Sequence, residues 1–461
     1  MKISIRNPAP LGRNLMKWGD YHFGQSLQAA LERKGVEVVQ RYWPEWGEED
    51  GDADAVLVLR GKRVFVPRPG QVALMWVLSH PAAVTLAEIQ SYSLVFLASE
   101  THRKLLGAAR VQTEVMRQCT DVDRFGVFNG VGQDADHRRG IVFVANSRGM
   151  RRPMVRWALE SGTPLDVYGR HWKEVEPQLR VKQEYVENEA LPALYARSRL
   201  SLNDHWGDMA HYGVINNRIF DCLACGTPVL SDDFPELREV CGSALLYAGD
   251  PTAFSSAIQR YTLRYPELID ATRELWSRIG RQYTFDARAD QIIAAVDSSL
   301  EPVRGGAPAR VDPATSAGPL FDVVRNLRDR GTEGEIKAVH VNPTEPLMHE
   351  FQRIDEISYL SAGAGAGGWH LRLDRDMDLL PARSLDLLVI DPAGRASEQD
   401  IAEWLPGAVR KVKVNGLIFV AGKLAEIEAM LVGQCGCIAL EGNGKGLYQP
   451  PAHSDPQLEG T

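Results

Sequence analysis

Short apolar runs alternate with amphipathic helical patterns along most of this chain, and that alternation is the strongest constraint on its fold. Strands that are separated by helices pair in parallel, because each helix carries the chain back across the sheet. The pattern therefore predicts an α/β fold. Its first Rossmann-like unit spans residues 1–130, with a helix that ends at Gly35 and strands predicted at 2–6, 37–43, 55–59, 72–78 and 93–99.

A second unit with the same alternation follows over residues 138–296. A short helix is predicted to start after Asn216 or Asn217 and to stop at Gly226, because Asn is a favoured N-cap and Gly a favoured helix stop. Two Rossmann-like units in tandem predict a ligand cleft between them. The other elements of this unit are helices predicted at 154–162, 252–263 and 268–296, and strands at 140–147, 164–169, 199–203 and 228–232.

The chain of 461 residues has room for a third domain. Residues 297–325 are rich in Pro, Gly, Ala and Ser and lack apolar periodicity, which predicts a linker. A third α/β unit is predicted over residues 326–461. Its strands are predicted at 337–341, 356–360, 385–391 and 416–422.

The charge balance excludes some classes of partner. The chain has 52 basic and 60 acidic residues, a formal net charge of −8, so broad electrostatic binding to nucleic acid or to an anionic membrane is not expected. No apolar run reaches the roughly 18 residues of a membrane span. The N-terminus, MKISIRNPAP, lacks the apolar core of a signal peptide. We therefore expect a soluble cytoplasmic protein.

The six cysteines do not form a disulfide framework in a chain of this length. Cys222 and Cys225 make a CxxC, but they lie inside the apolar helical run RIFDCLACG, and a zinc site needs a second pair of ligands. We predict buried, unreactive thiols.

The most informative segment covers residues 216–240 and reads NNRIFDCLACGTPVLSDDFPELREV. It predicts a short helix with Arg218 in its first turn and Asp221 one turn further on. A helix start attracts phosphate through unpaired N–H groups and the helix dipole. Arg218 would add charge-assisted bonds to a diphosphate, and Asp221 would accept hydrogen bonds from ribose hydroxyls. The alternative is an amphipathic helix with both side chains on its solvated face.

The run FDCLACGTPVLSDDFPELREV resembles the nucleotide-sugar motif of GT-B glycosyltransferases. It is most similar to a bacterial branch that resembles spore-maturation glycosyltransferases. GIVFVANSRGMRRPMV, VYGRHW and EYVENEALPALYARSRLSLNDHW match that branch in order and spacing, and RNPAPLGRNLMKWGDYHFGQSLQAAL resembles its first Rossmann-like half. The resemblance covers residues 1–296. It implies a GT-B fold and the transfer of a sugar from a nucleotide-sugar donor to a glycan or protein acceptor.

The resemblance implies a donor site that lies mostly in the second unit. Residues 146–151 would contact the donor phosphates, although a solvated basic turn is the alternative. Residues 168–186 would contact the nucleobase, although Trp172 and Tyr185 could equally be core aromatics. The implied donor-binding residues are Asn146, Ser147, Arg148, Arg151, Tyr168, Gly169, Trp172, Tyr185, Val186, Asn217, Arg218 and Asp221.

The chain departs from the family pattern at two positions. The residue that binds ribose is commonly Glu, and here it is the shorter Asp221. The partner Glu that many retaining members carry eight residues earlier is replaced by Gly213. The motif therefore does not support a retaining mechanism.

The first unit is expected to bind the acceptor and to supply any base. An inverting transfer needs a base for the acceptor hydroxyl, and the candidates are Asp20 and His22, predicted on the loop after the first strand, and His80, which resembles a cleft His of related enzymes. The alternatives are that His22 caps or packs its helix and that His80 only precedes Pro81 in a turn. No cofactor and no metal are expected. Asp204, His205, Asp208 and His211 resemble a metal cluster only in composition, and in the family the helix dipole and Arg take the place of a metal.

The third unit resembles a class I methyltransferase in KAVHV, LDLLVIDPAG and GLIFVAG. NPTEP at 342–346 replaces the expected glycine loop, and residues 361–363 replace the expected acidic residue, so close approach to a cofactor is not supported. The Gly-rich run at 362–368 has no following Lys or Ser/Thr, as a P-loop requires, and predicts a turn. We expect a methyltransferase-like domain without catalysis that serves acceptor docking or assembly, including oligomerisation.

The leading hypothesis is therefore a metal-independent glycosyltransferase whose donor diphosphate is held by a helix start and Arg218. Two alternatives remain open. One is a bifunctional protein whose third unit methylates with S-adenosylmethionine, and the other is a non-catalytic scaffold for glycan assembly.

Overall fold

The structure is a computed structural model. It describes residues 1–48, 50–68, 70–84, 86–106, 112–126, 138–300, 327, 336–341, 357–363, 371–372, 385–390, 405–406, 408–420, 427, 429–435, 437–439 and 446–449. The chain divides into two compact units. The first contains residues 1–146, 152–170 and 179–312, and the second contains residues 147–151, 171–178 and 313–461.

The first half of the first compact unit is a six-stranded parallel sheet with the order β2-β1-β3-β4-β5-β6. Three of the six strands, β3, β4 and β5, are buried along their whole length, because apolar runs such as AVLVLR and ALMWV are covered on both faces of the sheet. The elements are β1 (Lys2–Pro10), α1 (Gly19–Arg33), β2 (Glu37–Trp43), β3 (Ala55–Arg60), β4 (Ala73–Val77), α2 (Leu86–Gln90), β5 (Leu94–Leu97), α3 (Glu100–Leu106), β6 (Thr113–Val115) and α4 (Val122–Phe125).

The second half is another six-stranded parallel sheet, with the order β12-β11-β10-β7-β8-β9. The predicted α/β class with two Rossmann-like halves is confirmed. The elements are β7 (Arg139–Val144), α5 (Pro153–Glu160), β8 (Asp166–Tyr168), β9 (Val181–Gln183), α6 (Leu191–Arg197), β10 (Ser198–Asn203), α7 (Gly207–His211), α8 (Asn217–Ala224), β11 (Val229–Ser231), α9 (Pro235–Cys241), β12 (Leu246–Tyr247), α10 (Pro251–Leu263), α11 (Tyr265–Ile279) and α12 (Phe285–Leu300).

The helix α8 forms where the sequence predicts it. Asn216 is its N-cap position, although its side chain makes no capping hydrogen bond. The chain leaves the helix at Gly226, whose φ of 63° lies in the left-handed region. Only glycine adopts that region without a steric penalty from Cβ, which explains the stop.

The prediction of a single helix over 268–296 is wrong, because the structure has two helices there. The chain breaks there into α11 and α12, with a short 3-10 turn from Gly280 to Gln282 between them. The Thr284 hydroxyl accepts a hydrogen bond from the Ala287 N–H at 3.1 Å, so it caps α12 and starts a new helix.

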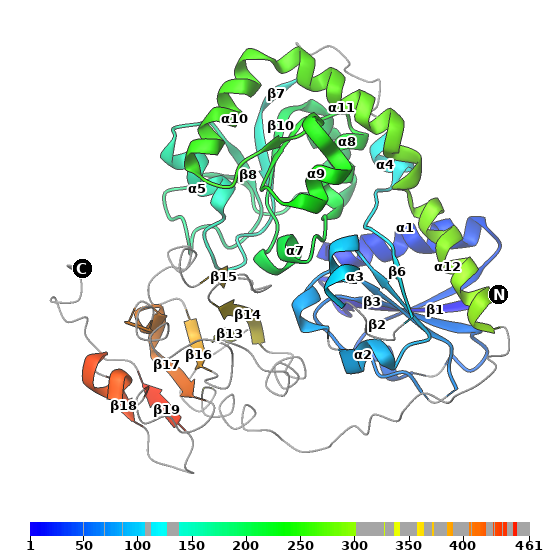
Figure 1. The fold of residues 1–461 in the computed structure, drawn as a ribbon, viewed down its shortest axis with the longest axis horizontal. Helices are drawn as coiled ribbons and strands as arrows, with labels where there is room; N and C mark the ends of the chain where they lie inside the picture. The colour runs from blue at the N-terminus through cyan, green and yellow to red at the C-terminus, as the bar shows by residue number, and fades with distance from the viewer. Residues whose placement is uncertain are drawn as a thin grey trace. The chain divides into compact units, whose positions relative to one another are not determined.

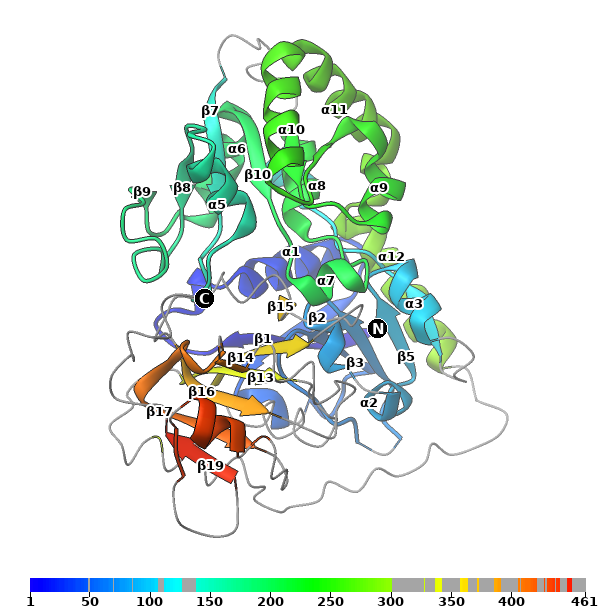
Figure 2. The ribbon, with the colours of Figure 1, turned by 60° about the vertical axis from the view of Figure 1, so that its left-hand side comes forward.

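The last helix of the second half returns to the first half. The helix α12 lies beside α1, as Figures 1 and 2 show. Arg33 holds Asp286 through two nitrogens, and the Phe23 and Phe285 rings meet edge to face with centroids 4.8 Å apart. Buried residues of both halves, from Ile3 to Val296, belong to one continuous hydrophobic cluster.

The second compact unit contains a seven-stranded sheet with the order β15-β14-β13-β16-β17-β19-β18. All recorded pairings are parallel except those of β19 with β17 and with β18. The four predicted strands of this region are present, and residues 361–363 continue β14. The predicted start of the linker at residue 297 is wrong, because residues 297–300 are the last turn of α12. The rest of the linker, the predicted replacement loop at 342–346 and residues 364–368 lie outside the described residues. The elements are β13 (Ile336–Val341), β14 (Ile357–Gly363), β15 (Leu371–Arg372), β16 (Leu385–Ile390), β17 (Val412–Val420), β18 (Ile438–Ala439) and β19 (Gly446–Gln449).

Within the described part of the chain, no helix combines the length and the apolar composition that crossing a membrane requires.

Phe285→Ala is expected to lower the free energy of unfolding by about 3–5 kcal/mol, because it removes a buried ring from the core that joins α1 to α12. Urea unfolding monitored by circular dichroism measures this loss. Leu263→Ala removes an apolar side chain that is 73% exposed and serves as the control, with an expected change within about 0.5 kcal/mol. Equal effects of the two substitutions would contradict the shared core.

Candidate active site

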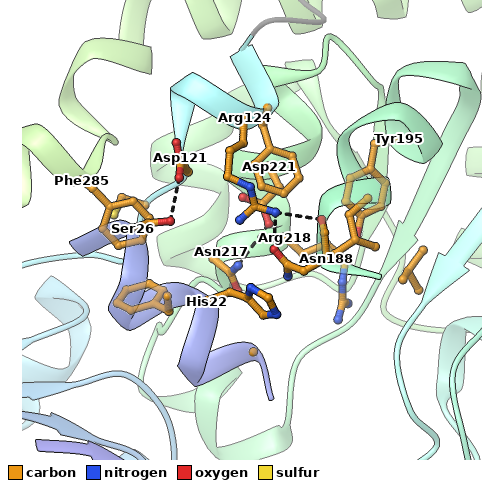
Figure 3. Close-up of a pocket in the computed structure, with 16 residues that line it drawn as sticks. His22, Ser26, Asp121, Arg124, Asn188, Tyr195, Asn217, Arg218, Asp221 and Phe285 are labelled. Carbon is orange, nitrogen blue, oxygen red and sulfur yellow. Dashed lines mark hydrogen bonds between the residues drawn. The ribbon is translucent and has the colours of Figure 1, made fainter. Parts of the chain in front are cut away.

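A cavity of about 180 Å³ lies between the two halves of the first compact unit. Side chains from α1, α4 and α8 face it, together with residues that precede and begin α6 (Figure 3). It brings together four predicted site residues: His22, Asn217, Arg218 and Asp221. The full lining is Gly19, His22, Phe23, Ser26, Cys119, Asp121, Arg124, Phe125, Val144, Asn188, Leu191, Tyr195, Asn217, Arg218, Asp221 and Phe285.

The start of α8 is held by polar partners. The Asn216 N–H donates to His205 Nε2 at 3.1 Å, and the Asn217 N–H donates to Gln118 Oε1 at 2.7 Å. Arg218 Nη1 donates to Asn203 Oδ1 at 2.9 Å. Two N–H groups at this helix start therefore already have acceptors, and the Arg218 side chain is the group that offers positive charge to an anion.

A second guanidinium lines the cavity at Arg124, which the sequence analysis missed. Arg124 lies on α4, in the segment between the two sheets, and its Nη2 donates to the Asn188 backbone oxygen at 2.8 Å and to Asn188 Oδ1. Both Arg124 and Arg218 act electrostatically on the same carboxyl group, that of Asp221. The cavity therefore contains two cations, one from the segment that joins the halves and one from α8.

Asp221 is almost fully buried, with 6% of its surface exposed. Its Oδ1 accepts from the Thr120 hydroxyl at 2.5 Å and its Oδ2 from Asn217 Nδ2 at 3.1 Å. Burial raises the pKa of the carboxyl to about 7, although Thr120, Arg124 and Arg218 favour the ionised form. Protein donors thus occupy both oxygens that were predicted to receive ribose hydroxyls.

His22 lines the cavity from the first turn of α1. Its Nε2 lies 2.7 Å from the Met16 backbone oxygen. A carbonyl only accepts, so Nε2 carries a hydrogen, and in the neutral form of the ring the lone pair is then on Nδ1. An imidazole that is oriented in this way can accept a proton.

The predicted positions of Asp20 and His22 on a loop are wrong, because α1 begins at Gly19 and includes both residues. Asp20 and His80 do not line the cavity. His80 adopts a left-handed conformation, with φ of 54°, immediately before Pro81, and its Nδ1 lies 3.0 Å from the Ser79 hydroxyl. A non-glycine residue in that region is strained, as residues at functional turns often are.

Three of the side chains predicted to contact donor phosphates on the loop after β7 make hydrogen bonds to backbone groups of the protein. Ser147 is fully buried, and its hydroxyl donates to the His171 backbone oxygen at 2.6 Å. Arg151 Nε donates to the Val175 oxygen at 3.2 Å. Asn146 Oδ1 accepts from the Arg170 N–H at 2.8 Å. Arg148 is exposed, with φ of 58°.

The residues predicted to contact the nucleobase divide into two groups. Trp172 is 1% exposed, so its ring packs inside the protein, as the alternative of a core aromatic predicts. Gly169 has φ of 138°, and a Cβ there would lie 2.1 Å from the Ala145 oxygen, so the fold itself requires glycine. Tyr168 ends β8 and is partly buried.

Tyr185 and Val186 lie in the loop after β9 and are both partly exposed. The Tyr185 hydroxyl donates to the Met16 backbone oxygen at 3.2 Å, and the same oxygen accepts a hydrogen bond from His22 Nε2. The Lys17 ammonium lies 5.9 Å and the Arg170 guanidinium 5.2 Å from the Tyr185 ring centre. Tyr185 therefore links the loop after β9 to the segment that precedes α1.

Gly213 stands where many retaining relatives were expected to carry Glu. Its φ is 73°, and a Cβ there would meet the Thr101 side chain at 2.8 Å and Glu236 Cβ at 3.0 Å. Packing excludes any side chain at this position, so no carboxylate can stand there without rearrangement.

Two of the four residues that resemble a metal cluster, Asp204 and His205, pair with other side chains. Asp204 pairs with Arg152, and His205 pairs with Asp232, with Nδ1 and Oδ1 2.7 Å apart. Among the residues that the structure describes, no three His, Cys, Asp or Glu side chains gather in a way that could hold a metal ion. Metal independence stays a prediction.

All six cysteines are free and buried. Burial raises the pKa of the Cys222 thiol to about 12, which disfavours the reactive thiolate.

Residues 148–294 match a family model described as "Glycosyl transferase-like". No curated protein sequence gives a significant match. Solved structures with a similar course of the chain include sucrose-phosphate synthase from Thermosynechococcus elongatus, with 13% identity over 64% of this chain and 98% of that chain and a TM-score of 0.47.

Two further similar structures are complexes. One is T4 phage BGT with UDP and Mn2+, with 11% identity over 64% of this chain and 100% of that chain and a TM-score of 0.44. The other is Anabaena HepE with UDP and glucose, with 12% identity over 65% of this chain and 100% of that chain and a TM-score of 0.43.

Asp221→Asn tests the buried carboxyl. In the folded protein Asp221 holds its proton up to about pH 7, whereas in the unfolded chain it loses the proton near its ordinary pKa of about 4. Between these values the folded state binds more protons, so Asp221 lowers the free energy of unfolding as pH rises, by at most about 1.4 kcal/mol per pH unit. The stability of Asp221→Asn relative to wild type should therefore increase from pH 4 to 7 and then level off.

Urea unfolding at intervals of one pH unit measures this difference. Asp297→Asn removes an exposed charge from α12 and controls for the change in net charge. A constant difference between Asp221→Asn and wild type across the range would show that the carboxyl is ionised in the folded state.

Proposed function

We propose that the two Rossmann-like halves form a glycosyltransferase that moves a sugar from a nucleoside-diphosphate sugar to a glycan or protein acceptor. The observation that carries this proposal is the cavity between the halves, where Arg124 and Arg218 lie beside the start of α8. The match of residues 148–294 to the glycosyl transferase-like family supports it independently. Arg218 and Asp221 lie within the matched residues, whereas Arg124 and His22 precede them in the chain.

The two guanidiniums would stabilise the diphosphate as it leaves. When the bond from the anomeric carbon to the diphosphate oxygen breaks, negative charge gathers on that oxygen. Fixed cations in a site of low dielectric stabilise such charge strongly, because they need no reorganisation during the reaction. Arg124 and Arg218 would supply two positive charges, so this step would need neither a metal nor a further cofactor.

His22 is the proposed base among the residues predicted from the sequence. The acceptor hydroxyl must lose a proton as its oxygen bonds to the anomeric carbon, and a neutral imidazole with a free Nδ1 can take it. The Met16 carbonyl fixes the ring by receiving the hydrogen of Nε2. Asp20 and His80 remain proposals and do not line the cavity, and His80 keeps the alternative that it only precedes Pro81 in a turn.

A ligand screen on the full chain tests the proposal. UDP, GDP, CDP and dTDP are added separately, and the melting temperature of each sample is compared with that of the ligand-free protein. A ligand present at about a hundred times its dissociation constant stabilises the fold by about 2.7 kcal/mol, so a binding nucleotide should shift the melting temperature by several degrees.

Arg218→Ala and Arg124→Ala should each weaken or abolish that shift, because each removes one cation from the cavity. Arg238→Ala is the matched control, since Arg238 is an exposed arginine on α9 that pairs with Asp233. A shift that survives both cavity substitutions would place the nucleotide elsewhere. The absence of any shift in a folded sample would favour the non-catalytic scaffold.

A second candidate activity is methyl transfer from S-adenosylmethionine by the third unit. The supporting observation is its sheet, in which β13 pairs with both β14 and β16, so that the strand order reverses at β13. In open α/β sheets ligands bind at the carboxyl ends of the strands at such a reversal. Adding S-adenosylhomocysteine to the same screen tests this candidate, and binding that Arg218→Ala leaves unchanged would assign it to the third unit.

A further inference from the structure

A strip of four residues after β6, from Arg117 to Thr120, joins the two halves of the first compact unit. Arg117 Nε donates to Glu236 Oε1 at 2.8 Å, and its backbone oxygen accepts from Arg288 Nε at 2.7 Å. The Thr120 N–H donates to the Tyr283 oxygen at 3.0 Å, and its hydroxyl donates to Asp221. The side chains of Arg117, Gln118 and Thr120 all make hydrogen bonds to the second half.

Gln118 makes the contact with the greatest consequence for the cavity. Its side chain is 6% exposed, and its Nε2 donates to the Leu78 backbone oxygen at 2.6 Å. Its Oε1 accepts from the Asn217 N–H at 2.7 Å. A carbonyl only accepts and an N–H only donates, so the amide has one possible orientation and bonds both halves at once.

The two groups that Gln118 joins belong to different parts of the candidate site. Leu78 follows β4 and precedes the strained turn at His80 by two residues. Asn217 is the first residue of α8, and Arg218 follows it. One buried amide therefore fixes the first turn of α8, and with it Arg218, relative to the end of β4.

We infer that Gln118 is a positioning residue for nucleoside-diphosphate binding, because it holds α8 at the place where Arg218 reaches the diphosphate. This inference rests on the proposed function. Gln118 does not line the cavity, so it would act through α8 and not by touching substrate. Since its oxygen already accepts from the Asn217 N–H, that N–H is not offered to the anion, which would depend on Arg218 together with Arg124. Gln118 would hold the backbone of α8 from which Arg218 extends, while Asn203 holds its side chain.

Isothermal titration calorimetry on the full chain tests the inference, with whichever of UDP, GDP, CDP and dTDP binds wild type. Gln118→Met keeps the length of the side chain but makes neither hydrogen bond. The expected result is about tenfold weaker binding, because a displaced Arg218 would lose part of its charge-assisted hydrogen bonding to the diphosphate. In the Arg218→Ala background Gln118→Met should weaken nucleotide binding by about twofold or less, because the two substitutions act through the same contact of Arg218 with the nucleotide.

Thr101→Val is the matched control. It removes the 2.8 Å hydrogen bond from the Thr101 hydroxyl to Glu236, another contact between the halves, without touching α8. It should lower the melting temperature and leave the nucleotide affinity within about twofold of wild type. If Gln118→Met does not fold, Gln118→Asn replaces it, because the amide is one methylene shorter and cannot reach both partners.

The outcomes separate the inference from the proposed function. If wild type binds none of the four nucleotides, the proposed function fails and the inference falls with it. If wild type binds one of them through Arg218 but the folded Gln118 variants bind equally well, only the inference is overturned. A purely structural Gln118 would lower the melting temperature as Thr101→Val does and leave the affinity unchanged.

Discussion

The burial of one continuous apolar core across both parallel sheets is the interaction on which the candidate site depends. Each half buries its own strands, but α12 carries the chain of the second half back onto α1 of the first. The core fixes the two halves of this unit against one another through side chains such as Phe23 and Phe285. Polar residues at the carboxyl ends of strands from two sheets can then meet around one cavity.

A shared core also imposes a requirement on the polar groups that it buries. A buried carboxylate is costly unless it is paired or protonated, and two carboxyls at this junction meet the requirement differently. Glu236 pairs with Arg117 and also accepts the Glu100 and Thr101 N–H groups at 3.1 Å each. Asp221 has hydroxyl and amide donors and no direct ion pair among its recorded contacts, and its pKa rises instead.

The sequence was sufficient for the features that follow from local pattern. The period of the apolar runs predicted most of the strands but not the short strands β6, β9, β12, β15, β18 and β19. The Asn and Gly residues around α8 predicted both of its ends. Arg218 and Asp221, which the pattern at 216–221 singled out, line the cavity. His22 lines it too, although it lies in the first turn of α1 and not on the predicted loop. For Trp172 the resemblance left two readings open, a base contact and a core aromatic, and its exposure of 1% favours the core aromatic.

Arg124 and Gln118 were missed for a physical reason. Neither lies in a motif, and each acquires its role from partners far away in the sequence: Asn188 for Arg124, and Leu78 and Asn217 for Gln118. A weak signal was available, since RQCTDVDR places two arginines and a Gln near the end of the first predicted unit, shortly before the second begins. Polar residues at such a junction must find partners once the core forms, and only the three-dimensional arrangement shows which ones they are.

The contacts at the start of α8 change the account of how the cavity would hold an anion. A helix start binds phosphate best when its N–H groups are unpaired, yet His205 and Gln118 already accept from Asn216 and Asn217. His205 and Gln118 thus take up two of the donors at the start of α8. Attraction of an anion would then come from the guanidiniums of Arg124 and Arg218 and from the remaining helix field. In a chain with a net charge of −8, such a local pair of cations is what would select a diphosphate.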